Sequence, residues 1–204
     1  MIEEASSQMD PRGLLAFYCS SRRGGNTDIL LDEFLRGAGD AGIRAERIYV
    51  SNLKLSGCRA CGGCDKTGRC VVEDGMQAVY ASLERNRFVV LASPIYFYSV
   101  PAQAKAVIDR SQAFWARKYL LGKVEGGGRK TPPARKGFFI SVGATRGKRM
   151  FEGVCLTIRY FFDAVDASYE GELLYRGSDG KGDIRGHPSA LKECYEAGKQ
   201  FAST

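Results

Sequence analysis

The stretch LLAFYCSSRRGGNTDILLDEFLRGAGDAG, residues 14–42, decides the fold class. It begins with a short apolar run over residues 14–20 and continues through a polar, glycine-rich turn over residues 20–27. Residues 27–42 then carry apolar side chains at helical spacing and end on glycines, as an amphipathic helix does. The apolar positions of this segment are Leu30, Leu31, Phe34, Leu35 and Ala38. The stretch therefore predicts a strand, a loop and a helix in succession.

Four further segments have the character of strands. Residues 43–50, IRAERIYV, alternate enough to predict an edge strand, whereas residues 87–94 and 137–143 are apolar runs typical of buried parallel strands. A fifth strand is predicted over about 168–175. The chain thus supplies five strands for one sheet.

Helical patterns separate these strands. The segment 100–121 has Pro101 near a first helical turn and apolar residues at helical spacing, and further helices are predicted over about 152–166 and 188–202. Strands that alternate with helices predict a parallel sheet covered on both faces. Five strands at this spacing fit the flavodoxin-like order 2-1-3-4-5, so we expect a three-layer α/β sandwich.

Length and composition favour one globular domain over residues 1–204. Hydrophobic residues make up 44% of the chain and charged residues 26%, which excludes general disorder. The sequence has no apolar run close to the roughly 18 residues of a membrane span, and the polar start MIEEASSQMDPRG does not have the layout of a signal peptide. We expect a cytoplasmic protein with no membrane partner.

The net charge of +7 suits an anionic partner, either nucleic acid, anionic lipid or a phosphorylated small molecule. The basic residues gather in short loop clusters and form no long helical stripe, which favours the phosphate of a cofactor over nucleic acid. Solvated loops are the simpler interpretation of each cluster. The basic loop 122–137 is a candidate for assembly or docking, with flexible decoration as the alternative.

Ligands of such folds bind beyond the carboxyl ends of the strands, where the strand order switches. The turn after the first strand offers hydroxyl groups from Ser20, Ser21 and Thr27, the charge of Arg22, and glycines that let backbone N–H groups approach an anion. The positive end of the following helix points at the same spot. The alternative is an ordinary turn with a helix cap at Asn26 or Thr27. The turn matches neither the P-loop nor the dinucleotide fingerprint.

This turn resembles that of the NADPH-dependent FMN reductase-like branch of the flavodoxin superfamily, and the segment 93–110 is similar to the flavin-contacting loop and helix of that branch. The resemblance implies FMN as cofactor, with NAD(P)H as a further substrate. It implies that a first group of residues holds the phosphate and that a second group lies along the flavin ring. The implied residues are Ser20, Arg22, Asn26 and Thr27 for the phosphate, and Pro94, Ile95, Tyr96 and Phe97 for the ring. Ser21 and Gly25 of the same turn, and Gly143 at the end of the fourth predicted strand, are further predicted cofactor-binding residues.

The aromatic residues of this second loop have a physical interpretation of their own. An aromatic-rich turn at the end of a buried strand can stack on a planar ring while its backbone N–H groups bond the polar rim of that ring. The alternative is that Tyr96, Phe97 and Tyr98 pack on the surface or at a subunit contact.

Four of the seven cysteines lie in the loop 57–71, at Cys58, Cys61, Cys64 and Cys70. A disulfide framework is a poor explanation in a reduced cytoplasm, and the compressed C-x2-C-x2-C-x5-C spacing differs from the paired layout of structural zinc sites. It suits the corners of an iron–sulfur cubane, although the last gap differs from the ferredoxin pattern. Bare thiols and zinc stay open as alternatives. The remaining cysteines, Cys19, Cys155 and Cys194, are expected to be buried, and His187 to be a turn or cap residue.

The cysteine spacing, followed by CVVEDGM, resembles the iron–sulfur flavoproteins of anaerobic archaea and bacteria from about residue 12 to the end. The resemblance implies a [4Fe-4S] cluster on the four cysteines, beside FMN, in a homodimer or homotetramer. It implies electron transfer between a donor, such as ferredoxin or NAD(P)H, and an acceptor. The redox partner is then either another protein or a small acceptor molecule. The alternatives are an NAD(P)H-dependent FMN or quinone reductase without a cluster, and a flavin-free scaffold protein. Because the cysteine loop follows the second strand, we expect it at the same sheet edge as the flavin loops.

Overall fold

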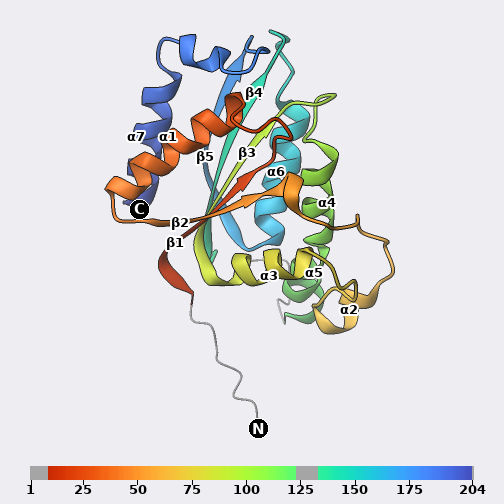
Figure 1. Cartoon of the computed structure of the whole chain (residues 1–204). Coiled ribbons are helices and arrows are strands. Elements are labelled where there is room, and N and C mark those ends of the chain that lie inside the picture. The colour runs from red at the N-terminus through yellow and green to blue at the C-terminus, as the bar shows by residue number, and fades with distance from the viewer. Residues whose placement is uncertain (1–8, 123–132, 204) are drawn as a thin grey trace.

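The computed structural model describes residues 9–122 and 133–203. Five strands form one parallel sheet in the order β2-β1-β3-β4-β5, which confirms the predicted flavodoxin-like topology (Figure 1). The strands are β1 (Asp10–Tyr18), β2 (Arg44–Tyr49), β3 (Asn86–Pro94), β4 (Arg135–Gly143) and β5 (Ala167–Arg176). The predicted basic loop 122–137 lies mostly outside the described residues.

Helices cover both faces of the sheet, so the layers are helix, sheet and helix (Figure 1). One face carries α1 (Asn26–Asp40) and α7 (Ala190–Ala202). The other carries α3 (Met76–Arg85), α4 (Ala102–Arg110), α5 (Gln112–Ala116) and α6 (Glu152–Ala164). Short elements complete the chain, namely α2 (Gly63–Thr67), η1 (Val50–Asn52), η2 (Arg117–Leu121) and η3 (Asp183–Gly186).

The alternation of β1 divides the core into two halves. Leu15 and Phe17 pack with the α3, α4 and α6 side, whereas Leu14, Ala16 and Tyr18 pack with α1 and α7. Successive strand residues point to opposite faces, so a strand buried on both faces has a continuous apolar sequence. This is why the first stretch of the sequence predicted the fold so directly.

Two local predictions need correction. The segment 100–121 is not one helix, because α4 ends at Arg110 and the chain re-forms as α5 and the π-helical turn η2. Arg135 does not lie in a basic loop, since it begins β4 and is buried. Its guanidinium donates to the carbonyl oxygens of Leu83 and Val165 and so links α3 to the end of α6. No helix within the described residues is long and apolar enough to span a membrane.

Helices α1 and α7 pack at unusually close range through glycine. A Cβ atom added at Gly198 would lie 1.9 Å from the carbonyl oxygen of Phe34, and one at Gly37 would lie 2.0 Å from that of Tyr195. These distances are shorter than any real contact, so the two helices touch backbone to backbone. The close packing brings the start of α7 beside the start of α1.

We expect Gly198→Ala to destabilise the protein by about 1–3 kcal/mol, because the added methyl group overpacks a rigid backbone contact. Gly39→Ala is the matched control, since it also lies in this helix pair and no atom of the described residues comes within 4 Å of its added Cβ. The control is expected to gain about 0.5–1 kcal/mol from helix propensity. Urea unfolding measures both; equal effects would contradict the packing argument.

Candidate functional site

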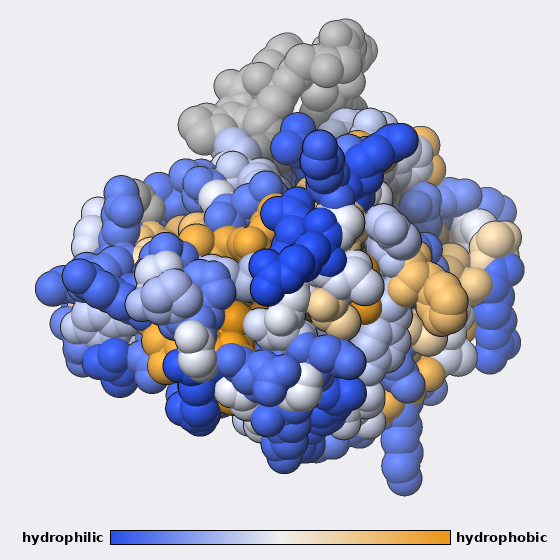
Figure 2. Space-filling model, turned by 90° about the horizontal axis from the view of Figure 1, so that it is seen from above, coloured by the Kyte–Doolittle hydropathy of each residue, from blue (hydrophilic) through white to orange (hydrophobic). Residues whose placement is uncertain are grey.

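Loops from four strands meet at the carboxyl edge of the sheet and enclose a pocket of about 80 Å³. Figure 2 looks down on this side of the molecule, where hydrophilic surface surrounds several hydrophobic patches. The pocket is far smaller than the roughly 300–1,000 Å³ of a whole small-molecule site, so its size suits one small group of a ligand. Eight predicted residues line it, namely Ser20, Arg22, Gly25, Asn26, Thr27, Pro94, Ile95 and Tyr96.

The turn after β1 is built by its own polar groups. The Ser20 hydroxyl accepts a hydrogen bond from the backbone N–H of Arg22 at 3.0 Å, and the N–H of Gly25 donates to the Arg22 carbonyl at 3.0 Å. Gly24 has a φ of 62°, a left-handed conformation that favours glycine. Because α1 starts at Asn26, its first backbone N–H groups have no partner within the helix and are free to face an anion.

The side chains of Arg22 and Asn26 also hold a loop that the sequence did not single out as part of the site. Arg22 Nη1 donates to the carbonyl of Asp179 at 2.8 Å. Asn26 Nδ2 donates to the carbonyls of Ser178 and Gly180, and its Oδ1 accepts from the N–H of Gly182 at 2.9 Å. Both polar ends of the Asn26 side chain are therefore engaged with this loop, which leaves its backbone N–H as the group that can face an anion.

Ser178 and Asp179, together with Val142 and Ala144, are the lining residues that sequence reasoning missed. The signal was indirect. Strand β5 lies at the far edge of the sheet, while α7 packs beside α1, so the chain between them must cross the carboxyl edge near the first turn. The close contact of Gly37 and Gly198 with their neighbouring helices helps to fix that route.

Three predicted residues do not line the pocket: Ser21, Phe97 and Gly143. Phe97 is fully exposed, and both it and Tyr98 have positive φ values, of 49° and 62°, in a tight turn closed by hydrogen bonds between Tyr96 and Ser99. A Cβ atom at Gly143 would lie 1.9 Å from the Met150 sulfur, so this glycine serves packing. The ring side of the predicted site is therefore an open surface and not a closed pocket.

Among the described residues of the basic loop clusters, only Arg22 lines this pocket. Arg23 lies over the ring of Tyr49, with its guanidinium carbon 3.4 Å from the ring centre. Arg149 pairs with Glu152 at 2.8 Å on the exposed surface. The positive charge at the pocket wall thus comes from one arginine and the helix start.

Asp28 is a buried acid directly behind the turn, with an exposed fraction of 3%. Burial raises the pKa of its carboxyl group from 3.8 to about 6, although the N–H of Gly24 donates to Oδ2 at 2.9 Å and acts in the opposite direction. Its Oδ1 is buried and has no hydrogen-bond partner among the described residues. The charged form of Asp28 is therefore unfavourable in the folded protein.

We expect Asp28→Asn to gain stability relative to the wild type as pH rises. A carboxyl group with a raised pKa binds its proton more tightly when folded, so its contribution to stability falls between about pH 3.8 and about pH 6. The free energy of unfolding of Asp28→Asn, relative to that of the wild type, should be about 1 kcal/mol more favourable to the variant at about pH 7.5 than at about pH 5. Urea unfolding at the two pH values measures it, and a pH-independent difference would contradict the burial of a charged carboxylate.

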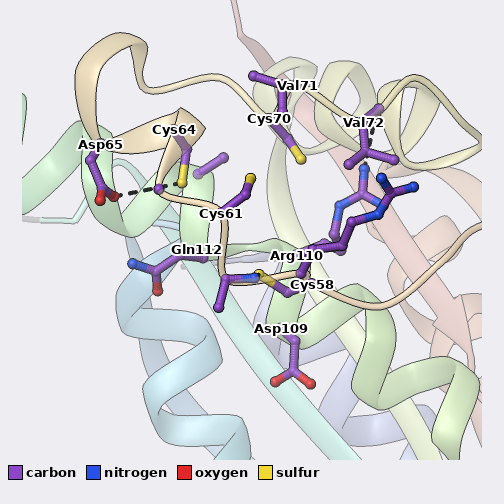
Figure 3. Close-up of a pocket in the computed structure, with 14 residues that line it drawn as sticks. Cys58, Cys61, Cys64, Asp65, Cys70, Val71, Val72, Asp109, Arg110 and Gln112 are labelled. Carbon is purple, nitrogen blue, oxygen red and sulfur yellow. Dashed lines mark hydrogen bonds between the residues drawn. The ribbon is translucent and has the colours of Figure 1, made fainter.

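A second pocket, of about 470 Å³, is lined by all four cysteines of the loop 57–71 (Figure 3). Cys58 and Cys61 are exposed, whereas Cys64 and Cys70 are partly buried. The loop turns tightly at Gly62 and Gly68, which have positive φ values of 68° each and bracket the short helix α2. The predicted cysteines thus share one cavity, together with Asp65, Asp109 and Arg110 from the loop and α4.

The described residues hold no group of three or more histidine, cysteine, aspartate or glutamate side chains already arranged to bind a metal ion. All seven cysteines, each of which is described, are free thiols. The donor set itself suits a soft metal or an iron–sulfur cluster, because four thiols surround one cavity. The four cysteines are therefore the right type of ligand for such a group. To bind it, the loop would have to bring the four thiols closer together.

The two pockets lie at opposite ends of α4. Pro94, Ile95 and Tyr96 line the pocket at the edge from which α4 begins, and Arg110, its last residue, lines the cysteine pocket. Nine helical residues at 1.5 Å each span about 13 Å. The expectation that the cysteine loop stays at the flavin edge is wrong for the single chain. The loop starts there after β2 and runs to the far end of α4 (Figure 1).

The other sulfur and imidazole groups have structural roles. Cys19 and Cys194 are buried as predicted, whereas Cys155 is only half-buried. His187 Nδ1 accepts hydrogen bonds from the backbone N–H groups of Ser189 and Ala190 at the start of α7, which confirms it as a cap residue.

Comparison with known proteins defines the class. The family model for NADPH-dependent FMN reductase matches residues 13–149, and the chain belongs to this family of flavin-dependent oxidoreductases. Within this class it is similar to proteins named iron–sulfur flavoprotein. One from Archaeoglobus fulgidus is 36% identical over 107 residues, which cover 52% of this chain and 49% of that protein. One from Methanosarcina thermophila is 29% identical over 118 residues, 58% of this chain and 62% of that protein.

The chain thus matches about half the length of several of these curated relatives. Solved structures agree on the fold. A flavone reductase superposes with a TM-score of 0.68 at 16% identity, covering 94% of this chain and 62% of that one. An NAD(P)H:quinone oxidoreductase from Methanothermobacter marburgensis superposes with a TM-score of 0.63 at 14% identity. The match covers 92% of this chain and 94% of that one.

Proposed function

We propose that this protein is an FMN-dependent oxidoreductase that also carries a [4Fe-4S] cluster on Cys58, Cys61, Cys64 and Cys70. It transfers electrons between a donor such as ferredoxin or NAD(P)H and an acceptor. The observation that carries the proposal is the pairing of an anion-binding turn at a helix start with a separate cavity lined by four thiols. When bound, FMN supplies two-electron chemistry and the cluster supplies single-electron transfer.

The residues of the first pocket account for FMN binding through the phosphate. The Arg22 guanidinium would make a charge-assisted hydrogen bond to a phosphate oxygen, and the first N–H groups of α1 would donate to the others. Ile95 and Tyr96 would contact the flavin ring along the open side of the pocket. The turn that Ser20 braces would hold these donors in place.

The residues of the second pocket account for the cluster. Four cysteines within the loop 57–71 would each give one thiolate to one iron, and the left-handed turns at Gly62 and Gly68 let so short a loop surround one group. Cys58 and Cys61 are exposed, so an assembling cluster can reach them.

The proposal includes a single domain over residues 1–204 and a cytoplasmic location, where a reducing environment keeps such thiols free. It also includes a homodimer or homotetramer in which the cysteine pocket of one subunit approaches the flavin of another. Exposed aromatic side chains support such a contact. They are Tyr96, Phe97 and Tyr98 beside the first pocket, and Trp115 and Tyr160 in a groove that shares Asp109 and Gln112 with the cysteine pocket.

An NAD(P)H-dependent FMN or quinone reductase without a cluster is the second candidate. It is favoured by the thiols, which are not arranged as a metal-binding group within the described residues. Anaerobic purification with iron, sulfide and flavin analysis decides between the two. The first function predicts about four iron, four sulfide and one FMN per chain. Background iron with bound FMN would leave the second function, and the absence of FMN binding would contradict both.

A further inference from the structure

Arg110, the last residue of α4, is buried at the wall of the cysteine pocket, with an exposed fraction of 2%. Its Nη1 donates to the carbonyl of Ser56 at 3.0 Å and to Asp74 Oδ2 at 2.8 Å. Its Nη2 donates to the carbonyl of Val72 at 3.0 Å and to Asp74 Oδ1 at 3.1 Å. One guanidinium thus makes four hydrogen bonds to three residues.

These contacts join the two ends of the cysteine loop. Ser56 lies two residues before Cys58, and Val72 lies two residues after Cys70. Asp74 adds a link of its own, since its Oδ2 accepts from the N–H of Ser56 at 3.0 Å. The segment that carries all four cysteines is therefore a closed loop. Arg110 closes it together with the Asp74–Ser56 bond and a backbone bond from the N–H of Gly75 to the carbonyl of Lys54.

The ion pair also has a direction. Arg110 is among the residues that line the cysteine pocket, whereas Asp74 is not, so the positive partner of the ion pair is the one that belongs to the pocket wall. In Figure 3 Arg110 lies beside Cys58, and its guanidinium group extends toward Val72. The Arg110 Nε is buried and has no hydrogen-bond partner among the described residues.

We propose that Arg110 is the positioning residue of the cysteine pocket. It fixes both ends of the loop before any ligand binds, and it places the positive partner of its ion pair at the wall of the cavity. The loop-fixing role rests only on the hydrogen bonds that Arg110 makes to Ser56, Val72 and Asp74. The charge role rests on the proposed function, because a positive charge beside a cluster of thiolates stabilises the more negative, reduced state and raises its reduction potential.

The loop part is tested on the metal-free chain with trypsin, which has sites within the loop at Arg59, Lys66 and Arg69. We expect Arg110→Met to speed cleavage at these sites about tenfold or more, because a tenfold change reflects the loss of only one or two net hydrogen bonds. Arg110→Lys keeps the positive charge but loses the paired hydrogen bonds of the guanidinium, so its cleavage rate should lie between those of the wild type and Arg110→Met.

The matched control is Lys105→Met, an exposed position on the same helix whose ammonium pairs with Asp109. It should cleave at the wild-type rate, and cleavage within α7 should be the same in all variants. If Arg110→Met does not fold, Arg110→Lys and Asp74→Asn carry the same test. Wild-type cleavage rates in folded Arg110 variants would overturn the proposal.

The charge part is tested on the loaded protein by redox titration, with the flavin couple as internal reference. Arg110→Met leaves Asp74 without its cation and should lower the cluster potential, whereas Asp74→Asn leaves Arg110 without its anion and should raise it. A tenfold change in the reduction equilibrium corresponds to 59 mV for one electron. Shifts in the same direction, or none, would overturn the charge role. A wild type that binds no iron would overturn the proposed cluster, while the cleavage rates would still decide whether Arg110 closes the loop.

Discussion

Replacing Cys61 by serine is expected to reduce the iron content of the anaerobically purified protein from about four per chain to less than about one. A [4Fe-4S] cluster in a loop this short has one thiolate for each iron, and serine is a poor ligand for soft metal centres. Cys61 is exposed, so its sulfur makes no core contact whose loss would unfold the chain. Iron and sulfide analysis, together with the visible spectrum, measures the effect.

The matched control is Cys155→Ser, because Cys155 is a half-buried thiol of α6 that does not line the cysteine pocket. It should keep wild-type iron. FMN content should be unchanged in both variants, since neither cysteine lines the first pocket. Full iron retention in Cys61→Ser would contradict the assignment of Cys61 as a cluster ligand.

Replacing Arg22 by alanine should weaken FMN binding about 10- to 100-fold. A hydrogen bond to a charged group contributes about 1.5–3 kcal/mol, and each 1.4 kcal/mol is a factor of ten in affinity. The variant also loses the bond from Arg22 Nη1 to the Asp179 carbonyl, so part of the pocket wall is released. Titration of the apoprotein with FMN, followed by quenching of flavin fluorescence, gives the dissociation constant.

Arg23→Ala tests whether the effect is specific. Arg23 carries the same charge one residue away, but its side chain stacks on Tyr49 and does not line the pocket. It should bind FMN within a few-fold of the wild type. Equal losses of FMN affinity in the two variants would indicate that Arg22 acts only through general surface charge. Wild-type FMN affinity in Arg22→Ala would contradict its assignment to the phosphate site.

The sequence predicted the fold because apolar periodicity is a local property. The buried runs of β1, β3 and β4 face helices on both sides, so their residues are apolar at nearly every position. The break after Arg110 was not predicted, since the residues on both sides of it keep helical spacing. Arg135 was misplaced for a related reason. A buried arginine is recognisable only through the distant carbonyl groups it satisfies, here those of Leu83 and Val165.

The candidate site was predictable where one loop supplies the chemistry. The turn 20–27 and the cysteine loop were found from residue types and spacing alone. The role of Asn26 as a brace for the loop 178–184 was not predicted, because all four hydrogen-bond partners of its side chain come from the other end of the chain. The position of the cysteine pocket was also missed. Nothing local in the loop indicates that Arg110, some forty residues later, draws it to the far end of α4.

The proposed electron transfer would have to cross the distance between the two pockets. The single chain places the thiols and the anion pocket about one short helix apart, and not side by side as the strand order alone suggested. A subunit contact that brings the second copy to the exposed aromatic side chains would shorten that path. This part of the account depends on an assembly that size measurements in solution can test.

The central claim is that one chain holds two redox groups, a flavin at the sheet edge and a four-thiolate cluster at the end of α4. Anaerobic reductive titration of the protein, with electrons counted per chain, tests it most directly. The account predicts about three electrons per chain, two for FMN and one for the cluster. An end point at about two electrons, with the flavin fully reduced, would contradict it.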